Sequence, residues 1–157
     1  MGGRYRLEQA RVRLRLEEAE PLYSRKPIEC PEDAVEAIAH DMAGMAEEHA
    51  AVINLDNAHR PLNYTVISIG DTNQAYIPIK SVFKAALLSN ASKILMMHNH
   101  PGGTAEPSSA DLEVTRRVAE AGKLMDMGLL DHVIVLGTTG KFISIREEHP
   151  ELFSEDT

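Results

Sequence analysis

The sequence predicts a single α/β or α+β domain built on a mixed β-sheet. Three observations favour this fold class. A length of 157 residues fits one domain. A content of 43% hydrophobic and 25% charged residues is typical of a globular protein. Short apolar runs alternate along the chain with segments whose apolar residues recur at helical spacing. Aromatic residues make up only 4% and tryptophan is absent, so we expect an aliphatic core.

The first part of the chain combines an alternating segment with a helix. Arginine and apolar residues alternate strictly from Arg11 to Leu16, which predicts a strand, a candidate edge strand of the sheet, with its arginines in solvent. Good helix formers on both sides leave a helix open as the alternative. Residues 17–30 resemble connecting chain. Residues 31–46 begin with Pro31 and early acidic residues and then show helical apolar spacing, which predicts a helix.

The rest of the chain alternates short strands with two longer helices. Mostly apolar or alternating runs predict strands at residues 50–55, 62–69, 93–97, 133–136 and 141–145. Helical apolar spacing predicts helices at residues 78–88 and 108–126, the second one stopped by Gly128. We expect the first two of these strands to form a hairpin and residues 98–107 to form a loop rich in glycine and proline. The acidic tail, residues 147–157, is expected to be loose.

Charge is distributed unevenly. The chain holds 16 basic and 24 acidic residues. Residues 1–27 contain seven of the basic and four of the acidic residues, a net of +3, so residues 28–157 carry nine and twenty, a net of −11. This balance predicts weak or undetectable binding of duplex DNA by the globular part, because such binding depends on neutralising phosphates. The basic N-terminal segment could contact an acidic partner, although a solvated face is the commoner explanation.

Several classes of protein are excluded or disfavoured. No apolar run approaches the roughly 20 residues that a membrane span needs. The N-terminus has basic residues but no apolar stretch of the kind found in signal peptides, so we expect a cytoplasmic protein. Cys30 is the single cysteine, which excludes a disulfide within the chain and a cysteine-rich zinc site. Any metal would therefore be held by histidines and carboxylates.

Residues 98–111 contain the candidate metal ligands of the chain. His98 and His100 stand two apart where a buried strand runs into a loop, and residues i and i+2 of extended chain point to the same side. Asp111, in the first turn of the following helix, can return a carboxylate to the same point. Two histidines, an aspartate and a water molecule form a tetrahedral zinc site with one open position. The alternative is purely structural: Ser108 and Asp111 also have the spacing of a helix capping box, and a single histidine is more often a packed residue.

The pattern His98-x-His100-x₇-Ser108-x₂-Asp111 resembles the JAMM (MPN-plus) zinc metalloprotease motif. The wider stretch, from His-Asn-His-Pro-Gly-Gly through Pro107 to Leu-Asp-His-Val-Ile-Val at residues 130–135, is similar to RadC-family proteins. The resemblance covers residues 28–146. RadC-family proteins usually carry a helix-hairpin-helix segment before this domain, and nothing in residues 1–27 matches it, so the chain resembles a stand-alone RadC-like domain.

The resemblance implies an MPN-type fold, a curved mixed β-sheet flanked by helices, with zinc held by the two histidines and Asp111. It implies that Glu48 takes a proton from zinc-activated water and passes it to the leaving group, and that Ser108 hydrogen-bonds the developing oxyanion. Glu47 is expected to be a solvated helix-end carboxylate. Asp131 and His132 match the family's Leu-Asp-His and are expected to support the fold or to contact a ligand from behind.

The expected activity is hydrolysis of an amide or isopeptide bond in a peptide or protein substrate. The alternative is a non-catalytic, metal-containing accessory module associated with DNA repair or mobile elements. A zinc-dependent deaminase or nuclease is a third, weaker alternative, and the ligand set of zinc deaminases needs a pair of cysteines that one cysteine does not supply. The sequence does not identify the substrate or the oligomeric state.

Overall fold

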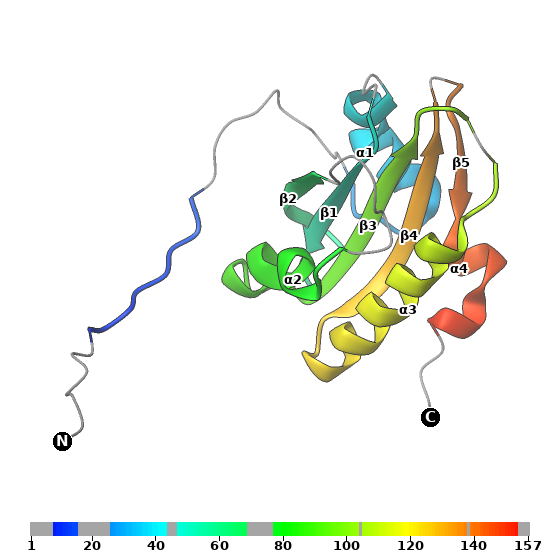
Figure 1. The fold of residues 1–157 in the computed structure, drawn as a ribbon. Coiled ribbons are helices and arrows are strands. Elements are labelled where there is room, and N and C mark those ends of the chain that lie inside the picture. Colours follow the sequence, from blue (N-terminus) through cyan, green and yellow to red (C-terminus); the bar gives the residue numbers. More distant parts are fainter. Residues whose placement is uncertain are drawn as a thin grey trace.

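A five-stranded mixed sheet forms the centre of the computed structural model, which describes residues 8–15, 26–43, 47–68, 77–103, 105–137 and 139–153 (Figure 1). The strands are β1 His49–Leu55, β2 Pro61–Ser68, β3 Lys93–His100, β4 Gly128–Leu136 and β5 Lys141–Ser144. They lie in the order β2-β1-β3-β4-β5. The β3–β4 pair is parallel and the other three pairs are antiparallel. The predicted mixed sheet and the predicted β1–β2 hairpin are therefore confirmed.

Helices cover both faces of this sheet. They are α1 Pro31–Ala43, α2 Ile79–Leu88, α3 Ser109–Leu124 and α4 Ile145–Glu148, followed by a 3-10 turn at Pro150–Leu152. Figure 1 shows α1 behind the sheet and α2 and α3 in front of it. This is the mixed α/β arrangement expected from the sequence. Within the described part of the chain, no helix has the length and apolarity needed to cross a membrane.

Alternate residues of each strand pack on opposite faces and build two aliphatic core clusters. On the face of α2 and α3, Val52, Ile94 and Met96 pack with residues such as Phe83 and Val118. On the face of α1, the intervening strand residues pack with Ile28 and Ala34; they are Ala51, Ile53, Leu55, Leu95, Met97, Val133 and Val135. Because β1 and β3 are buried on both sides, they are continuous apolar runs, as sheets covered on both faces require.

A register shift in β4 changes the face to which its second half points. Ile94 pairs with Leu129, whereas Met96 pairs with His132, so two residues of β3 span three of β4. Leu129 packs in the cluster under α3, and after the extra residue His132 faces the same side. Regular alternation would have put His132 on the opposite face from Leu129. Bulges of this kind re-aim side chains and often lie beside functional sites.

The structure corrects two boundaries near the predicted site. The strand predicted at residues 93–97 continues to His100, so both histidines belong to β3 and the loop begins at Pro101. Gly128 does not stop α3: the helix ends at Leu124, Asp126 adopts the left-handed conformation, and Gly128 is already the first residue of β4. Parallel pairing with β3 keeps both strands extended further than their apolar runs indicate.

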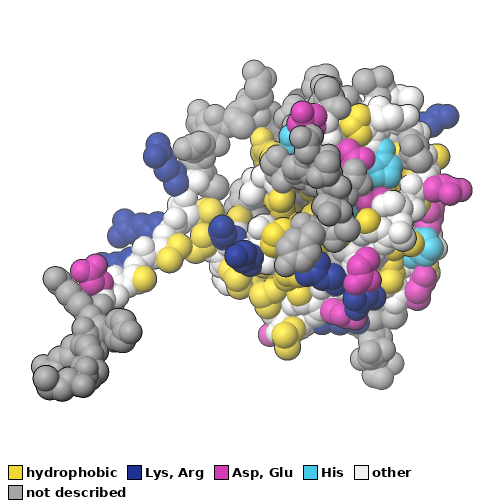
Figure 2. Space-filling model, viewed as in Figure 1, with side chains coloured by type: hydrophobic (Ala, Val, Ile, Leu, Met, Phe, Trp, Pro, Cys, Tyr) yellow, Lys and Arg dark blue, Asp and Glu magenta, His cyan; other side chains and the backbone are white. Residues whose placement is uncertain are grey.

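Residues 8–15, the described part of the alternating segment, are not part of the sheet. The candidate edge strand at residues 11–16 was expected from its alternation, but the described residues 8–15 form neither helix nor strand and all are exposed. Figure 2 shows basic side chains along one edge of this segment and apolar ones along the other. An alternating pattern is not sufficient, because a strand also needs a neighbour to accept and donate its backbone hydrogen bonds. Leu16, Ile69, the helix end at 44–46 and the loop at 70–73 lie outside the described residues.

The C-terminal tail is more ordered than the sequence indicates. Residues 147–153 were expected to be loose, but Glu147 and Glu148 lie in α4 and a 3-10 turn follows. Leu152 and Phe153 pack against the core cluster under α3. The Arg146 guanidinium lies 5.6 Å from the centre of the Phe153 ring. Leu152 and Phe153, at the end of the acidic stretch, therefore hold the tail against the core. The acidic composition of the tail does not indicate this packing.

Candidate metal centre

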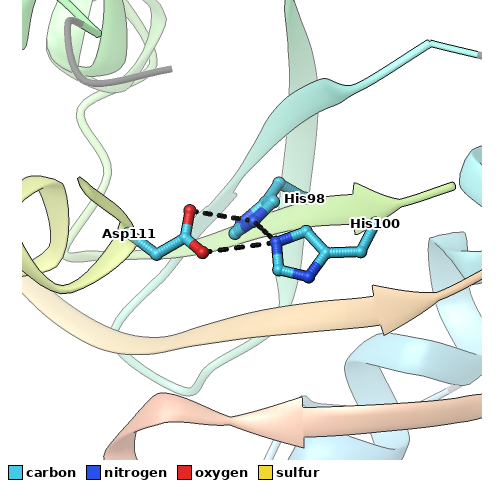
Figure 3. Close-up of side chains that lie close together, drawn as sticks. All are labelled: His98, His100 and Asp111. Carbon is cyan, nitrogen blue, oxygen red and sulfur yellow. Dashed lines mark hydrogen bonds and ion pairs between the residues drawn. The ribbon is translucent and has the colours of Figure 1, made fainter. Parts of the chain in front are cut away.

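Three predicted metal ligands meet where β3 ends and α3 begins. His98 and His100 project from the last residues of β3, and Asp111 projects from the first turn of α3 toward them (Figure 3). Potential ligand atoms of the three residues all lie within 4.8 Å of one another. All three residues are buried, with exposed fractions of 3%, 7% and 5%. The sheet and the helix cap thus hold the cluster on a rigid frame.

Asp111 belongs both to this cluster and to the cap of α3. Ser108 is the N-cap: its Oγ accepts a hydrogen bond from the Asp111 N–H at 3.1 Å, and its own N–H donates to Asp111 Oδ2 at 2.8 Å. This is a capping box, which satisfies two backbone donors at the helix start. The structural interpretation of the Ser-x-x-Asp spacing is therefore correct. It does not exclude the metal-site interpretation, because the same carboxylate also faces both histidines.

The nitrogens and oxygens of the cluster converge closely. His98 Nε2 lies 2.9 Å from His100 Nε2 and 3.2 Å from Asp111 Oδ1. His100 Nε2 lies 3.2 Å from Asp111 Oδ2. Burial alone would raise the pKa of Asp111. The adjacent His100 and His98 rings more than offset burial and hold the pKa of Asp111 well below its usual range. An anionic carboxylate and two imidazoles are a donor set suited to a divalent transition metal.

His132 lies directly behind the cluster. Its Nε2 is 2.7 Å from His98 Nδ1, and its Nδ1 is 2.7 Å from the hydroxyl oxygen of Thr115. Burial, reinforced by the neighbouring His98, lowers the pKa of His132 well below its usual value, so it is neutral near pH 7. His132 therefore contacts His98, a candidate ligand, from behind. Ligating histidines in metal sites usually have such a partner on the second ring nitrogen.

Asp131 fixes the strand around His132. Its carboxylate accepts hydrogen bonds from the Ser144 hydroxyl at 2.6 Å and from the backbone N–H groups of His132 at 2.6 Å and Arg146 at 3.0 Å. Burial raises the pKa of Asp131, although these donors oppose the rise. Asp131 thus ties β4 to β5 and to the start of α4, which is the predicted support of the fold.

Glu48 lies immediately before β1. Among the described residues, its buried Oε2 atom has no hydrogen-bond partner. Ala50 pairs with His98 across the antiparallel β1–β3 ladder. Extending that register by two residues places Glu48 opposite His100, on the face that carries the cluster. A buried carboxylate oxygen without a hydrogen-bond partner is costly in a folded protein. Its position beside a candidate metal centre therefore favours a functional role for Glu48.

Two residues of the site were not identified from the sequence. Asn99 accepts a hydrogen bond from the His49 N–H at 2.7 Å and donates one to the Glu47 carbonyl at 3.0 Å, so it holds the backbone on both sides of Glu48. Thr115 was assigned no role. The available signals were weak: Asn99 is a polar residue between two histidines in a buried run, and Thr115 stands one helical turn after Asp111.

Comparison with known proteins decides the family. The family model described as RadC-like JAB domain matches residues 28–150, most of the chain. The chain belongs to the RadC-like JAB domain family. UPF0758 proteins of Chloroflexus aggregans and Shouchella clausii are 39% and 37% identical to it over 123 residues, which cover 78% of this chain and 53% of each relative. A UPF0758 protein of Listeria monocytogenes is 37% identical over 121 residues, 77% of this chain and 53% of the relative.

The chain thus spans about half the length of the curated relatives it matches. The names of these relatives state no activity. Membership in the RadC-like JAB domain family agrees with the mixed sheet flanked by helices and with the position of the cluster at the end of β3.

Proposed function

We propose that the chain is a zinc-dependent hydrolase of the JAMM type that cleaves an amide or isopeptide bond in a peptide or protein. The observation that carries this proposal is the buried cluster of His98, His100 and Asp111. Family membership supports a JAMM-like fold around that cluster.

The donor set supports zinc and an open coordination position. Two imidazole nitrogens and one carboxylate are three protein ligands, the number typical of catalytic rather than structural zinc. A zinc ion in such a site lowers the pKa of water toward neutrality and polarises a carbonyl group. His98, His100 and Asp111 would hold the ion, while the capping box and the end of β3 keep their side chains in place.

Glu48 is proposed as the general base. Its partnerless Oε2 is an acceptor that nothing in the described part of the chain occupies. Glu48 would accept a proton from the attacking water and return it to the leaving nitrogen. The hydrogen bonds of Asn99 to the residues on either side would keep Glu48 in position.

Ser108 is proposed to stabilise the oxyanion. Its Oγ is already an acceptor for the Asp111 N–H, which leaves its hydroxyl proton available as a donor. Ser108 is exposed, so a substrate can reach this hydroxyl. A hydrogen bond to the oxygen that develops negative charge would favour the transition state over the bound substrate.

A non-catalytic accessory domain is the second candidate. The observation that favours it is the structural use of Asp111, because a metal held there would tie the N-terminus of α3 to the sheet. In this case the ion would stabilise the fold and Glu48 would have no proton to transfer. Direct contact of the globular part with DNA is disfavoured by its net charge of −11, counted as nine basic and twenty acidic residues.

Metal content tests the centre itself. Protein purified with zinc supplementation should contain about one zinc ion per chain, as expected for one three-ligand site. His100→Ala should lose most of it, whereas the control His149→Ala should keep it, because His149 lies in the C-terminal turn and contacts Glu151. Elemental analysis that finds no transition metal in the wild-type protein would contradict the proposal.

Hydrolysis of a mixed peptide and isopeptide library separates the two candidates. Glu48→Gln should abolish hydrolysis while zinc content and the circular dichroism spectrum remain those of the wild type, since it removes the proton acceptor but no ligand. The matched control Glu47→Gln changes the adjacent, exposed carboxylate and should retain activity. Full turnover by Glu48→Gln would refute the role of Glu48. A wild-type protein that binds zinc but cleaves nothing in the library favours the accessory domain.

A further inference from the structure

An unbroken chain of buried hydrogen bonds runs behind the metal centre. It starts at the backbone carbonyl of Asp111, passes through the Thr115 hydroxyl and the His132 ring, and ends at His98 Nδ1. Its three links are each 2.7 Å long. Thr115 and His132 are 0% and 2% exposed. The chain therefore connects the backbone of one candidate ligand, Asp111, to the ring of another, His98.

The protons in this chain can be placed by counting donors. The Asp111 carbonyl carries no proton, so the 2.7 Å contact with Thr115 Oγ1 is a hydrogen bond only if the hydroxyl donates. Threonine hydroxyls in helices commonly donate to the carbonyl four residues earlier. The single hydroxyl proton is then used. Thr115 can only accept from His132, so His132 Nδ1 carries a proton and donates it.

The same count of donors then places a proton on Nδ1 of His98. In the described part of the chain, the His132 nitrogens contact one hydroxyl and one imidazole and no carboxylate, and a buried cation without a counter-ion is strongly disfavoured. A neutral His132 with its proton on Nδ1 has a bare Nε2, which accepts. His98 Nδ1 must then donate the third hydrogen bond. With Nδ1 used in this way, Nε2, which faces His100 and Asp111, is the His98 nitrogen that can bind a metal.

We propose that Thr115 and His132 are positioning residues that hold His98 in the Nδ1–H tautomer, with Nε2 free to bind the metal. The inference rests on the proposed metal centre and deepens it. Without the chain, a neutral His98 would divide between two tautomers, and the Nε2–H form cannot be a ligand through that nitrogen. Because the chain begins on the Asp111 backbone, it also couples the positions of two ligands on different elements.

The reverse proton order is the alternative that the geometry disfavours. In that order Thr115 donates to His132, His132 Nε2 donates to His98, and His98 Nε2 donates to Asp111 Oδ1. The hydroxyl and carbonyl oxygens would then face each other at 2.7 Å with no proton between them. The contact would be repulsive, and a small rotation of the Thr115 side chain would relieve it. The observed contact therefore favours a hydroxyl that donates to the helix.

Nitrogen-15 NMR of the metal-free 157-residue chain tests the proton order directly. At pH 8 the wild type should show protonated Nδ1 atoms on His98 and His132 and a bare, pyridine-type Nε2 on His132. A spectrum with the His132 proton on Nε2 would overturn the proposal. This measurement needs neither bound zinc nor a substrate, so it decides the tautomer even if the chain proves not to be a hydrolase.

Zinc affinity measured by competition with a chelator tests the consequence. Thr115→Val keeps the shape of the side chain but removes the acceptor, and it should weaken zinc binding by about tenfold to a hundredfold, the usual effect of losing a partner behind a ligand. Thr115→Ser keeps the hydroxyl and should bind zinc within about threefold of the wild type. Far-UV circular dichroism checks that both variants fold, and nitrogen-15 spectra of Thr115→Val should show loss of the His132 Nδ1 proton.

Equal affinities of Thr115→Val and the wild type would overturn the proposal, as would a Thr115→Ser variant as weak as Thr115→Val. A wild type that takes up no zinc would refute the metal centre itself, and the NMR result would still decide the proton order. If Thr115→Val fails to fold, His132→Gln and His132→Leu replace it. The glutamine carbonyl can accept from His98 Nδ1, so His132→Gln should bind zinc more tightly than His132→Leu, and the opposite order would contradict the role of His132.

Discussion

Gly122, near the end of α3, is where one added methyl group should disturb the fold most clearly. A β-carbon built at Gly122 would lie 2.3 Å from the carbonyl oxygen of Met127. This is roughly 1 Å closer than ordinary van der Waals contact. The obstacle is backbone, which cannot rotate away as a side chain can. The turn around it is also fixed, since the Met127 N–H donates to the Gly122 carbonyl at 2.8 Å.

Two opposing effects determine the stability of Gly122→Ala. Alanine is favoured over glycine inside a helix by about 1 kcal/mol. Overpacking a well-filled position costs about 1–3 kcal/mol, and a clash with backbone belongs at the upper end of that range. We therefore expect Gly122→Ala to lower the free energy of unfolding by about 2 kcal/mol. Urea unfolding followed by far-UV circular dichroism measures this difference.

Gly128→Ala is the matched control, because nothing lies within 4 Å of a β-carbon at Gly128 and its backbone is not left-handed. It should unfold within about 0.5 kcal/mol of the wild type. Displacing α3 from β4 would also separate Thr115 from His132, so Gly122→Ala should bind zinc more weakly than the control. A Gly122→Ala protein as stable as Gly128→Ala would refute the reasoning.

Three further predictions concern parts of the chain outside the metal centre. The Lys26 ammonium and the Glu29 N–H hold the pKa of Asp33 at about 2, so Asp33 stabilises the fold above about pH 4 and this stabilisation is lost as the pH falls toward 2. Because Lys26 is mostly exposed, Lys26→Met should lower the free energy of unfolding only modestly at pH 7 and by less near pH 2, as measured by urea unfolding at both pH values; an equal loss at both pH values would contradict a contribution from this ion pair. Phe153→Ala should lower the free energy of unfolding by about 3 kcal/mol, whereas no change would indicate that the tail is loose after all. Duplex DNA binding by the whole chain should be weak in fluorescence anisotropy, and the seven basic residues of residues 1–27 limit the salt slope to about 6; a slope near 8 would require a basic surface that the −11 body lacks.

Local spacing made the cluster of three candidate metal ligands predictable. Residues two apart in extended chain share a face, so His98 and His100 had to point the same way once their segment was recognised as continuing a strand. A Ser-x-x-Asp pattern at a helix start places both side chains at the first turn, so the position of Asp111 followed as well. What the sequence left open was whether the cap or the metal site was the correct interpretation. The structure contains the cap and also brings the same carboxylate to both histidines, because one of its oxygens can accept from the helix start while the group faces the two rings.

Pairing between segments distant in sequence determines the positions of several residues that local sequence patterns do not predict. The role of His132 depends on one extra residue in β4, which turns its ring toward α3, and no local pattern encodes the register of a parallel strand pair. Asn99 acts on the backbone around Glu48 only because β1 and β3 are neighbours. The same principle explains the errors at both ends of the chain: residues 8–15 alternate like a strand but have no partner in the sheet, and the acidic tail is held by Phe153 in a core built from other elements.

The sequence by itself thus determined the aliphatic core, most of the helices and strands, and the three residues that could hold a metal. These features depend on side-chain chemistry and on spacing within one element, where strand and helix geometry is fixed. Tertiary structure alone decided the hydrogen-bond chain through Thr115 and His132, the orphaned oxygen of Glu48, and the ordering of the last turn. These depend on which segments lie side by side, and that is set by the packing of the whole sheet and its helices.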